Sequence, residues 1–173
     1  KSDLKIRNLA SVVGTGLGDD FNYSMLRFGK IIPLTDADVD GAHIQLLFTA
    51  FMYKYMPELI KKGHLFIAET PLYKLEKKGA NKQVVYIKND AEFEARYPNG
   101  IPSGWERNRF KGLGEMNPNQ LKETAMNPET RTLKQVIYDE QDAERYIQTF
   151  DDLMGDDPSK RFEFIKHNVN FSE

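Results

Sequence analysis

Apolar residues recur at every third or fourth position in three segments of the chain, a spacing that places them on one face of an α-helix. The helices predicted in this way cover residues 3–13, 42–55 and 143–153. Gly14 and Gly155 follow the first and the last, where glycine commonly ends a helix. Pro57 restarts the second as a short turn that ends at Gly63.

Short apolar runs between these helices predict β-strands. Residues 30–35 and 64–68 flank the second predicted helix. A strand, a helix and a strand over about 40 residues suit a right-handed parallel crossover. Residues 72–75 and 84–87 are separated by a polar turn with a glycine, which predicts an antiparallel hairpin. The pattern therefore predicts an α/β fold that changes from parallel to antiparallel pairing.

Beyond residue 90 the chain carries repeated helix-start signals. Asp90 can cap a short helix. Asn117-Pro118 and Asn127-Pro128 each combine a good N-cap with proline at the first helical position. A last apolar stripe includes Phe162, Ile165 and Val169. These signals predict a mostly helical C-terminal region.

Composition limits the classes of protein that fit. With 173 residues, of which 40% are hydrophobic and 29% charged, the chain is typical of a soluble, cytoplasmic globular protein. No apolar stretch approaches the ~18 residues that a membrane span requires. The absence of cysteine excludes disulfides and thiolate metal sites. A net charge of −2 means that any contact with nucleic acid must be local or shared with a partner.

The strongest chemical signal is the sequence Asp36-Ala-Asp-Val-Asp-Gly41, between a predicted strand and a predicted helix. Residues two apart on an extended strand end point the same way, so Asp36, Asp38 and Asp40 could converge. Crowded carboxylates repel one another unless a cation neutralises them. Oxygen ligands suit Mg²⁺, Mn²⁺ or Ca²⁺. The segment therefore predicts a divalent-metal site.

Other interpretations of this segment are open. An EF-hand loop begins similarly but requires a glutamate at its twelfth position, where this chain has Leu47. The aspartates could instead cap the following helix, with Asp40 as the N-cap, although three are more than a cap needs. His43 could contact phosphate or carry a proton, but a histidine early in a helix is commonly a packing or capping residue.

Several segments, in order along almost the whole chain, resemble the B-type subunits of bacterial type IIA DNA topoisomerases, the family of DNA gyrase and topoisomerase IV. The segments are 14–21, 35–44, 55–60, 71–74, 110–117, 126–133 and 153–156. The resemblance implies part of a TOPRIM domain over 1–72, with a Rossmann-like parallel sheet. It also implies a tail over 73–173, with the hairpin, a Lys-Gly-Leu-Gly loop and helices that contact the A-type subunit.

The resemblance also implies an activity. In this family Mg²⁺ supports the cleavage of double-stranded DNA by a tyrosine of the A-type subunit, within an ATP-dependent type II topoisomerase of the nucleoid. The family's Asp-x-Asp ligands fall on Asp36 and Asp38, and Asp40 completes the motif. Lys111, in the Lys-Gly-Leu-Gly loop, looks like the basic residue near the cleavage site, although an exposed lysine can simply be solvated. Arg109 and His43 are further expected DNA contacts.

One departure from the family pattern changes what is expected of this chain. The family's TOPRIM domain opens with a Glu-Gly-Asp motif whose glutamate is a metal ligand, and here no glutamate precedes Glu58. We expect that glutamate, and the N-terminal ATPase part that binds ATP, upstream or on a separate polypeptide, and the chain alone to be inactive. The alternatives are a stand-alone TOPRIM hydrolase or nuclease and a catalytically silent subunit-interaction module.

Overall fold

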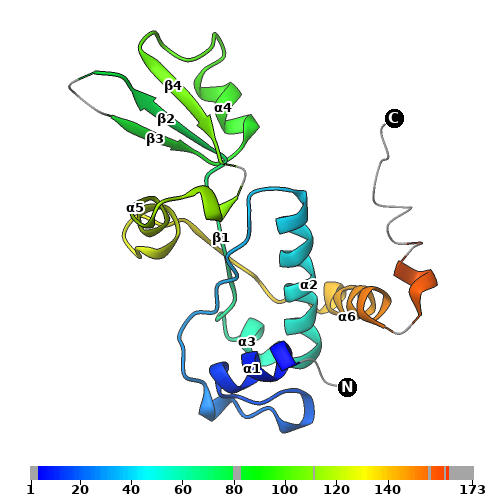
Figure 1. Cartoon of the computed structure of the whole chain (residues 1–173). Coiled ribbons are helices and arrows are strands. Elements are labelled where there is room, and N and C mark those ends of the chain that lie inside the picture. The colour runs from blue at the N-terminus through cyan, green and yellow to red at the C-terminus, as the bar shows by residue number, and fades with distance from the viewer. Residues whose placement is uncertain (1–3, 80–82, 111, 156, 162, 164–173) are drawn as a thin grey trace. The chain divides into compact units, whose positions relative to one another are not determined.

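The structure is a computed structural model that describes residues 4–79, 83–110, 112–155, 157–161 and 163 (Figure 1). The chain divides into two compact units, each built from separate stretches. Unit 1 comprises Lys1–Ile31, Leu46–Phe66 and Gln135–Glu173, and unit 2 comprises Ile32–Gln45 and Ile67–Lys134. The boundary at residue 72 that the family implies stays a prediction. Within the described residues, no helix is both long and apolar enough to cross a membrane.

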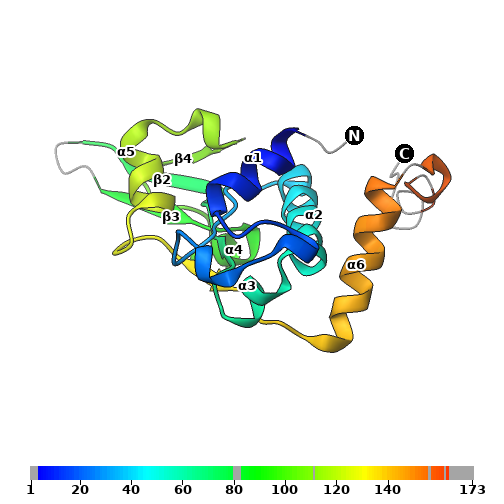
Figure 2. The same ribbon diagram turned by 90° about the horizontal axis from the view of Figure 1, so that it is seen from below.

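Unit 1 is a group of helices around the C-terminal half of α2 (Val39–Tyr55) (Figure 2). The other helices are α1 (Leu4–Val13), α3 (Pro57–Lys61) and α6 (Glu140–Met154). Met52, Met56 and Leu59 are fully buried. The second half of α2 is apolar on nearly all sides, which is typical of a helix enclosed by its neighbours. Three predicted helices are thus confirmed, and Gly14 has the left-handed backbone expected of a helix cap.

Aromatic side chains join α6 to α2 within unit 1. The Tyr53 ring stacks between the rings of Tyr138 and Tyr146, with centroids 5.2 and 4.5 Å away. Phe150, the buried residue of α6, makes an edge-to-face contact with Tyr55. The apolar stripe of α6 is therefore a packing face, and its tyrosine belongs to the core of this unit.

The parallel strand pairing expected for the crossover is reduced, in the described residues, to one β-bridge. Ile31 pairs in parallel with Leu65, and its amide donates to the His64 carbonyl at 2.7 Å. Pro33 has no amide hydrogen, and residues 32–35 form no strand. The strand β1 (Phe66–Ala68) pairs instead with β5 (Leu133–Gln135), which the apolar pattern did not predict. The fold is mixed α/β, and the TOPRIM parallel sheet stays a prediction.

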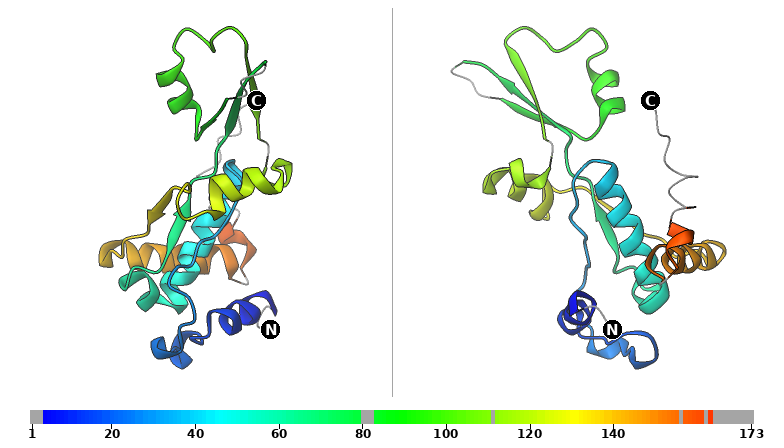
Figure 3. Two further views of the ribbon diagram at one scale, coloured as in Figure 1. Left: turned by 90° about the vertical axis from the view of Figure 1, so that its left-hand side faces the viewer. Right: turned by 45° about the vertical axis from the view of Figure 1, so that its right-hand side comes forward.

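Unit 2 contains a three-stranded antiparallel sheet in the order β3-β2-β4 (Figure 3). Its strands are β2 (Tyr73–Lys77), β3 (Val84–Ile87) and β4 (Trp105–Arg109). The predicted hairpin is confirmed, with Tyr73 opposite Ile87. The edge strand β4 escaped prediction because it holds one apolar residue, Trp105, and its other side chains are exposed.

Helix α4 (Asp90–Arg96) packs on the core of this sheet through Phe93. Its N-cap is Asn89, whose side chain accepts from the Glu92 amide at 2.9 Å, and not Asp90 as predicted. Asp90 instead accepts a hydrogen bond from the Tyr73 hydroxyl. This bond holds the proton on the hydroxyl and raises the pKa of Tyr73 above its ordinary value.

The two Asn-Pro signals have different outcomes. Asn117 starts α5 (Pro118–Leu121) with the predicted cap, which is completed by Gln120. A π-helical turn, η4 (Lys122–Met126), follows. The helix predicted at Asn127 is wrong, because the Asn127 carbonyl closes a turn with the Thr130 and Arg131 amides. The apolar stripe predicted after residue 161 lies outside the described residues.

Glu69, just after β1, joins three segments of unit 2. One carboxylate oxygen lies 2.5 Å from the Lys134 ammonium, and the other lies 2.8 Å from that of Lys88. The hydrogen bond from Lys134, and then that from Lys88, lowers the pKa of Glu69 from its ordinary value of 4.5. A carboxyl group whose pKa is lower in the folded state stabilises the fold above its unfolded pKa.

We therefore predict that Glu69→Gln lowers the free energy of unfolding at neutral pH. The difference from the unsubstituted chain should shrink as the pH falls below about 4.5, where the carboxyl of the unfolded chain takes up its proton first, and it should be lost once the pH passes the lower pKa of the paired carboxylate. Urea denaturation at a series of pH values measures this difference. The exposed Glu94→Gln should show a much smaller effect. A Glu69 effect independent of pH would contradict the assigned ion pairs.

Candidate functional site

The acidic segment of unit 2 leads directly into α2. The Asp38 carboxylate accepts the Gly41 amide hydrogen at 2.7 Å, and its carbonyl accepts from the Ala42 amide. Asp38 is therefore the N-cap of the helix, a role that the sequence suggested for Asp40. Asp40 already lies in the first turn. The strand-like alternation expected over residues 36–40 is wrong, because the helix begins at Val39.

Gly41 is required where α2 starts close to the backbone of Asp36. A Cβ atom at position 41 would lie 2.0 Å from the Asp36 carbonyl oxygen. Real Cβ atoms do not approach a backbone atom so closely, so only glycine fits without a shift of the chain. The last residue of the Asp-x-Asp-x-Asp-Gly sequence is thus a packing requirement of the turn.

The Lys-Gly-Leu-Gly loop meets Asp36 from a point 77 residues further along the chain. The Leu113 amide, at the start of η3 (Leu113–Glu115), donates to Asp36 Oδ1 at 2.7 Å. A Cβ atom at Gly112 would lie 2.8 Å from Asp36 Oδ2, so the loop backbone lies close to both carboxylate oxygens. Lys111 lies outside the described residues. The structure therefore brings the acidic segment and this loop together.

Thr35 fixes the chain just before Asp36. It is buried, and its hydroxyl accepts from the Gln45 side chain at 2.6 Å. Its carbonyl accepts a longer hydrogen bond, 3.4 Å, from the Thr70 hydroxyl. The apolar pattern and the acidic motif gave no role to Thr35, Gly112 or Leu113. The glycines of the loop were the available signal, because a backbone that approaches another group closely commonly needs glycine.

The carboxylates of Asp36 and Asp38 are of the ligand type that Mg²⁺ prefers. In the described part of the chain, the hydrogen bonds to Asp36 and Asp38 use only Oδ1 of each carboxylate. Their Oδ2 atoms are hard oxygen donors, and Gly112 allows the loop backbone to lie close to that of Asp36. Among the described residues there is no group of three or more acidic or histidine side chains arranged to hold a metal. Mg²⁺ commonly uses one or two carboxylates, with water and phosphate oxygens as its other ligands.

The expected DNA contacts lie on two elements of unit 2. His43 is exposed in the early part of α2. Arg109, at the end of β4, is exposed, and its guanidinium lies 5.9 Å from the Tyr73 ring centroid. Arg107 lies 5.1 Å from the same centroid and 4.7 Å from that of Phe93. The rings of Tyr73 and Phe93 thus lie against both guanidinium groups. Within the described residues neither arginine forms an ion pair, so both positive charges stay available to an anion.

Comparisons with known proteins give a consistent result. The family described as DNA gyrase B subunit, carboxyl terminus, matches residues 102–166. The B subunit of DNA gyrase from Thermus thermophilus is 45% identical over 173 residues, covering 98% of this chain and 26% of the relative. The B subunit of DNA topoisomerase 4 from Staphylococcus epidermidis is 47% identical over 169 residues, covering 96% of this chain and 25% of the relative. The chain thus spans about a quarter of the length of these relatives.

The close approach of Gly41 to Asp36 predicts whether alanine at position 41 raises or lowers the free energy of unfolding. Alanine normally stabilises a helix by about 1 kcal/mol relative to glycine. We expect Gly41→Ala to lower the free energy of unfolding instead, because its Cβ would overlap the Asp36 carbonyl. Gly114→Ala is the matched control, since a Cβ there meets nothing within 4 Å. Urea denaturation measures both. A Gly41→Ala chain more stable than the unsubstituted one would contradict the close approach.

Proposed function

Because the chain belongs to the family of the B-type subunits of type IIA DNA topoisomerases, we propose that it is part of an ATP-dependent type II DNA topoisomerase. In this role it supplies Mg²⁺ ligands for the cleavage and religation of double-stranded DNA by a tyrosine of an A-type partner subunit. The observation that carries the proposal is the hydrogen bond from Leu113 to Asp36, which joins the acidic motif to the Lys-Gly-Leu-Gly loop.

The proposed roles of the acidic residues follow from their contacts. Asp36 and Asp38 would hold Mg²⁺ through their Oδ2 atoms, and Mn²⁺ or Ca²⁺ could replace it. Asp40, in the first turn of α2, adds negative charge and would act through a bound water. When bound, the metal stabilises the charge that develops on the scissile phosphate and the leaving oxygen. The Leu113 amide orients Asp36, since it fixes Oδ1 and directs Oδ2 away from that bond.

The cationic residues would position DNA without reading its sequence. Arg109 and Arg107 rest on the rings of Tyr73 and Phe93, which hold their guanidiniums in place. Lys111 and His43 are further proposed phosphate contacts. Contacts to phosphate carry no base information and release counterions, so DNA binding should weaken with salt and tolerate changes of sequence.

The remaining parts of the proposed enzyme lie on other polypeptide segments. The A-type subunit would supply the tyrosine, and an ATPase part of the B-type subunit would bind ATP. One observation favours a second candidate, a catalytically silent module that only binds its partner subunit. Asp38 caps α2, which is a structural reason for that carboxylate that needs no metal.

Asp38→Ser separates these two candidates. Serine is as good an N-cap as aspartate but is a much poorer ligand for Mg²⁺. We predict that the free energy of unfolding of the Asp38→Ser variant lies within about 0.5 kcal/mol of that of the unsubstituted chain. Its Mg²⁺ affinity should fall by about tenfold or more, because one of two carboxylate ligands is lost. Asp38→Ala, the matched control, should lose both the cap and the ligand. Denaturation and calorimetric Mg²⁺ titration measure the two quantities.

The same variants are to be tested in the assembled enzyme, with the ATPase part and the A-type subunit present. There we predict that Asp38→Ser lowers ATP-dependent strand passage while DNA binding in the absence of metal is retained. Unchanged Mg²⁺ affinity and unchanged strand passage would leave the cap as the sole role of Asp38, and would favour the silent module.

A further inference from the structure

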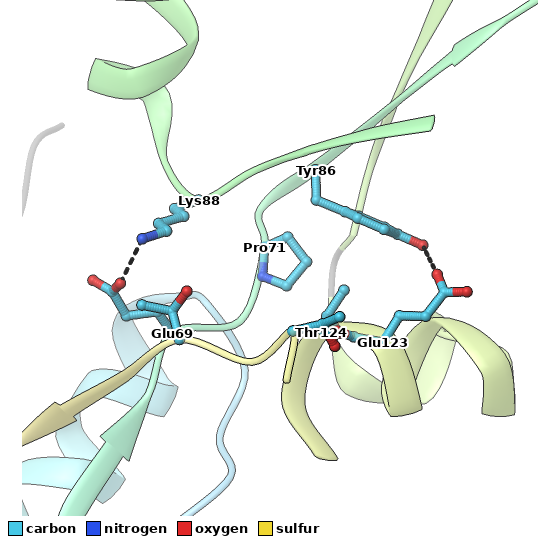
Figure 4. A pocket seen from close by; sticks show the side chains of 8 residues that line it. Glu69, Pro71, Tyr86, Lys88, Glu123 and Thr124 are labelled. Atoms are coloured by element: carbon cyan, nitrogen blue, oxygen red, sulfur yellow. Dashed lines mark hydrogen bonds and ion pairs between the residues drawn. The ribbon is translucent and has the colours of Figure 1, made fainter. Parts of the chain in front are cut away.

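Unit 2 contains a cavity of about 490 Å³ that the acidic segment does not line (Figure 4). Its lining residues are Glu69, Pro71, Tyr86, Lys88, Glu123, Thr124, Thr130 and Thr132. They come from the segment after β1, from β3 and its end, and from η4 and the segment that follows it. The volume lies within the range of sites for small molecules, roughly 300–1,000 Å³.

At one end the cavity is lined by Lys88 and Glu69, and a second lysine, Lys134, pairs with the same carboxylate from outside the lining. Lys88 lies 2.8 Å from one oxygen of Glu69, as Figure 4 shows. Lys134 occupies the other oxygen of the same carboxylate at 2.5 Å. Two ammonium groups thus share a single carboxylate, so about one positive charge at this end has no counter-charge among these three residues. Of the two ammonium groups only that of Lys88 lines the cavity, so Lys88 is the cation that a ligand can reach, beside a carboxylate that Lys134 also neutralises.

The other end carries a net negative charge. The Glu123 carboxylate accepts a long hydrogen bond, 3.4 Å, from the Tyr86 hydroxyl. No lysine or arginine of the described residues forms an ion pair with it. Burial, and then the charge of Glu123, raises the pKa of Tyr86, so this hydroxyl keeps its proton and adds no negative charge of its own. Figure 4 shows the two ends on opposite sides of Pro71.

The middle of the cavity is apolar, and the threonine hydroxyls near Glu123 can accept hydrogen bonds from a ligand but not donate them. The Pro71 ring and the face of Tyr86 lie between the charged ends. The hydroxyl hydrogens of two threonines are already used: that of Thr124 bonds the Gln120 carbonyl at 2.7 Å, and that of Thr130 bonds the Glu123 carbonyl at 2.5 Å. Near Glu123, therefore, a ligand meets lone pairs, which suit an ammonium group.

From these features we propose that the cavity binds a small zwitterion, with an ammonium group at Glu123, a carboxylate at Lys88 and a flat apolar body between them. A ligand with a single charge would leave the opposite end facing an unmatched group. Both charges of a zwitterion are satisfied in one orientation. The site goes beyond the proposed topoisomerase function, since its residues take no part in holding Mg²⁺ or DNA there.

The test uses the full chain and the probe 4-(2-aminoethyl)benzoate, which carries an ammonium and a carboxylate at opposite ends of a ring. Phenethylamine and 4-ethylbenzoate are the matched probes with one charge each. Calorimetric titration should show saturable binding of the zwitterion, about three- to tenfold tighter than either matched probe. Adding Mg²⁺ should leave this affinity unchanged, which separates the result from the metal site.

Substitutions assign each end of the cavity. Glu123→Gln should weaken the zwitterion and phenethylamine by about three- to tenfold and leave 4-ethylbenzoate unchanged. Lys88→Met should weaken the zwitterion and 4-ethylbenzoate and leave phenethylamine unchanged. Glu94→Gln and Lys77→Met, exposed and outside the cavity, are the controls. Glu123 is exposed and forms no ion pair with a described residue, so Glu123→Gln should unfold as the unsubstituted chain does. Lys88→Met removes one ion pair of Glu69 and should lower the free energy of unfolding, so denaturation must show that this variant is folded under the conditions of the titration.

Two results would overturn the proposal. The first is an absence of saturable zwitterion binding up to roughly 10 mM, the upper end of weak specific binding. The second is a loss of affinity that does not follow the charge of the probe, with each variant weakening all three probes equally or none of them.

Discussion

The candidate site depends on the hydrogen bond between the Leu113 amide and the Asp36 carboxylate. It joins two short segments that have little structure of their own and that lie 77 residues apart. Glycine on each side makes the contact possible, because Gly41 lies against the Asp36 carbonyl and Gly112 against its carboxylate. A fixed amide in place of a mobile water leaves the second oxygen of Asp36 in one orientation, which is what a metal ligand requires.

Asp38 caps α2 and is also a proposed metal ligand, two roles that are usually considered alternatives. One of its oxygens caps α2, and the other is a donor that the helix does not use. A carboxylate at a helix N-terminus interacts favourably with the helix dipole, which suits Asp38 to this position. The cap is therefore compatible with the proposed metal site, although it does not require one. It also explains why three aspartates need not converge: Asp40 is in the helix, and Mg²⁺ can be completed by water and phosphate.

The sequence predicts a helix or strand when the residues of that element alone determine it, and fails when the element depends on partners far away in the chain. The β2–β3 hairpin, α2, α5 and α6 follow from apolar spacing and caps, and all are present. The strands β4 and β5 carry few apolar side chains, and they exist because partners far away in the sequence accept their backbone hydrogen bonds. Likewise Asp36 and Asp38 were found from their residue type, whereas the Leu113 amide contributes through its backbone, and only the neighbouring glycines of the loop signal it in the sequence.

The central claim, that Asp36 is a metal ligand oriented by the Leu113 amide, can be tested by adding Mn²⁺ to the isotopically labelled chain and recording amide NMR spectra. Paramagnetic broadening falls steeply with distance from the bound ion. The account predicts that small amounts of Mn²⁺ broaden the amide resonances of Leu113 and Gly41 first, that Mg²⁺ reverses this, and that Asp36→Ala abolishes it. Sharp Leu113 and Gly41 resonances at a Mn²⁺ concentration that broadens other acidic segments would contradict it.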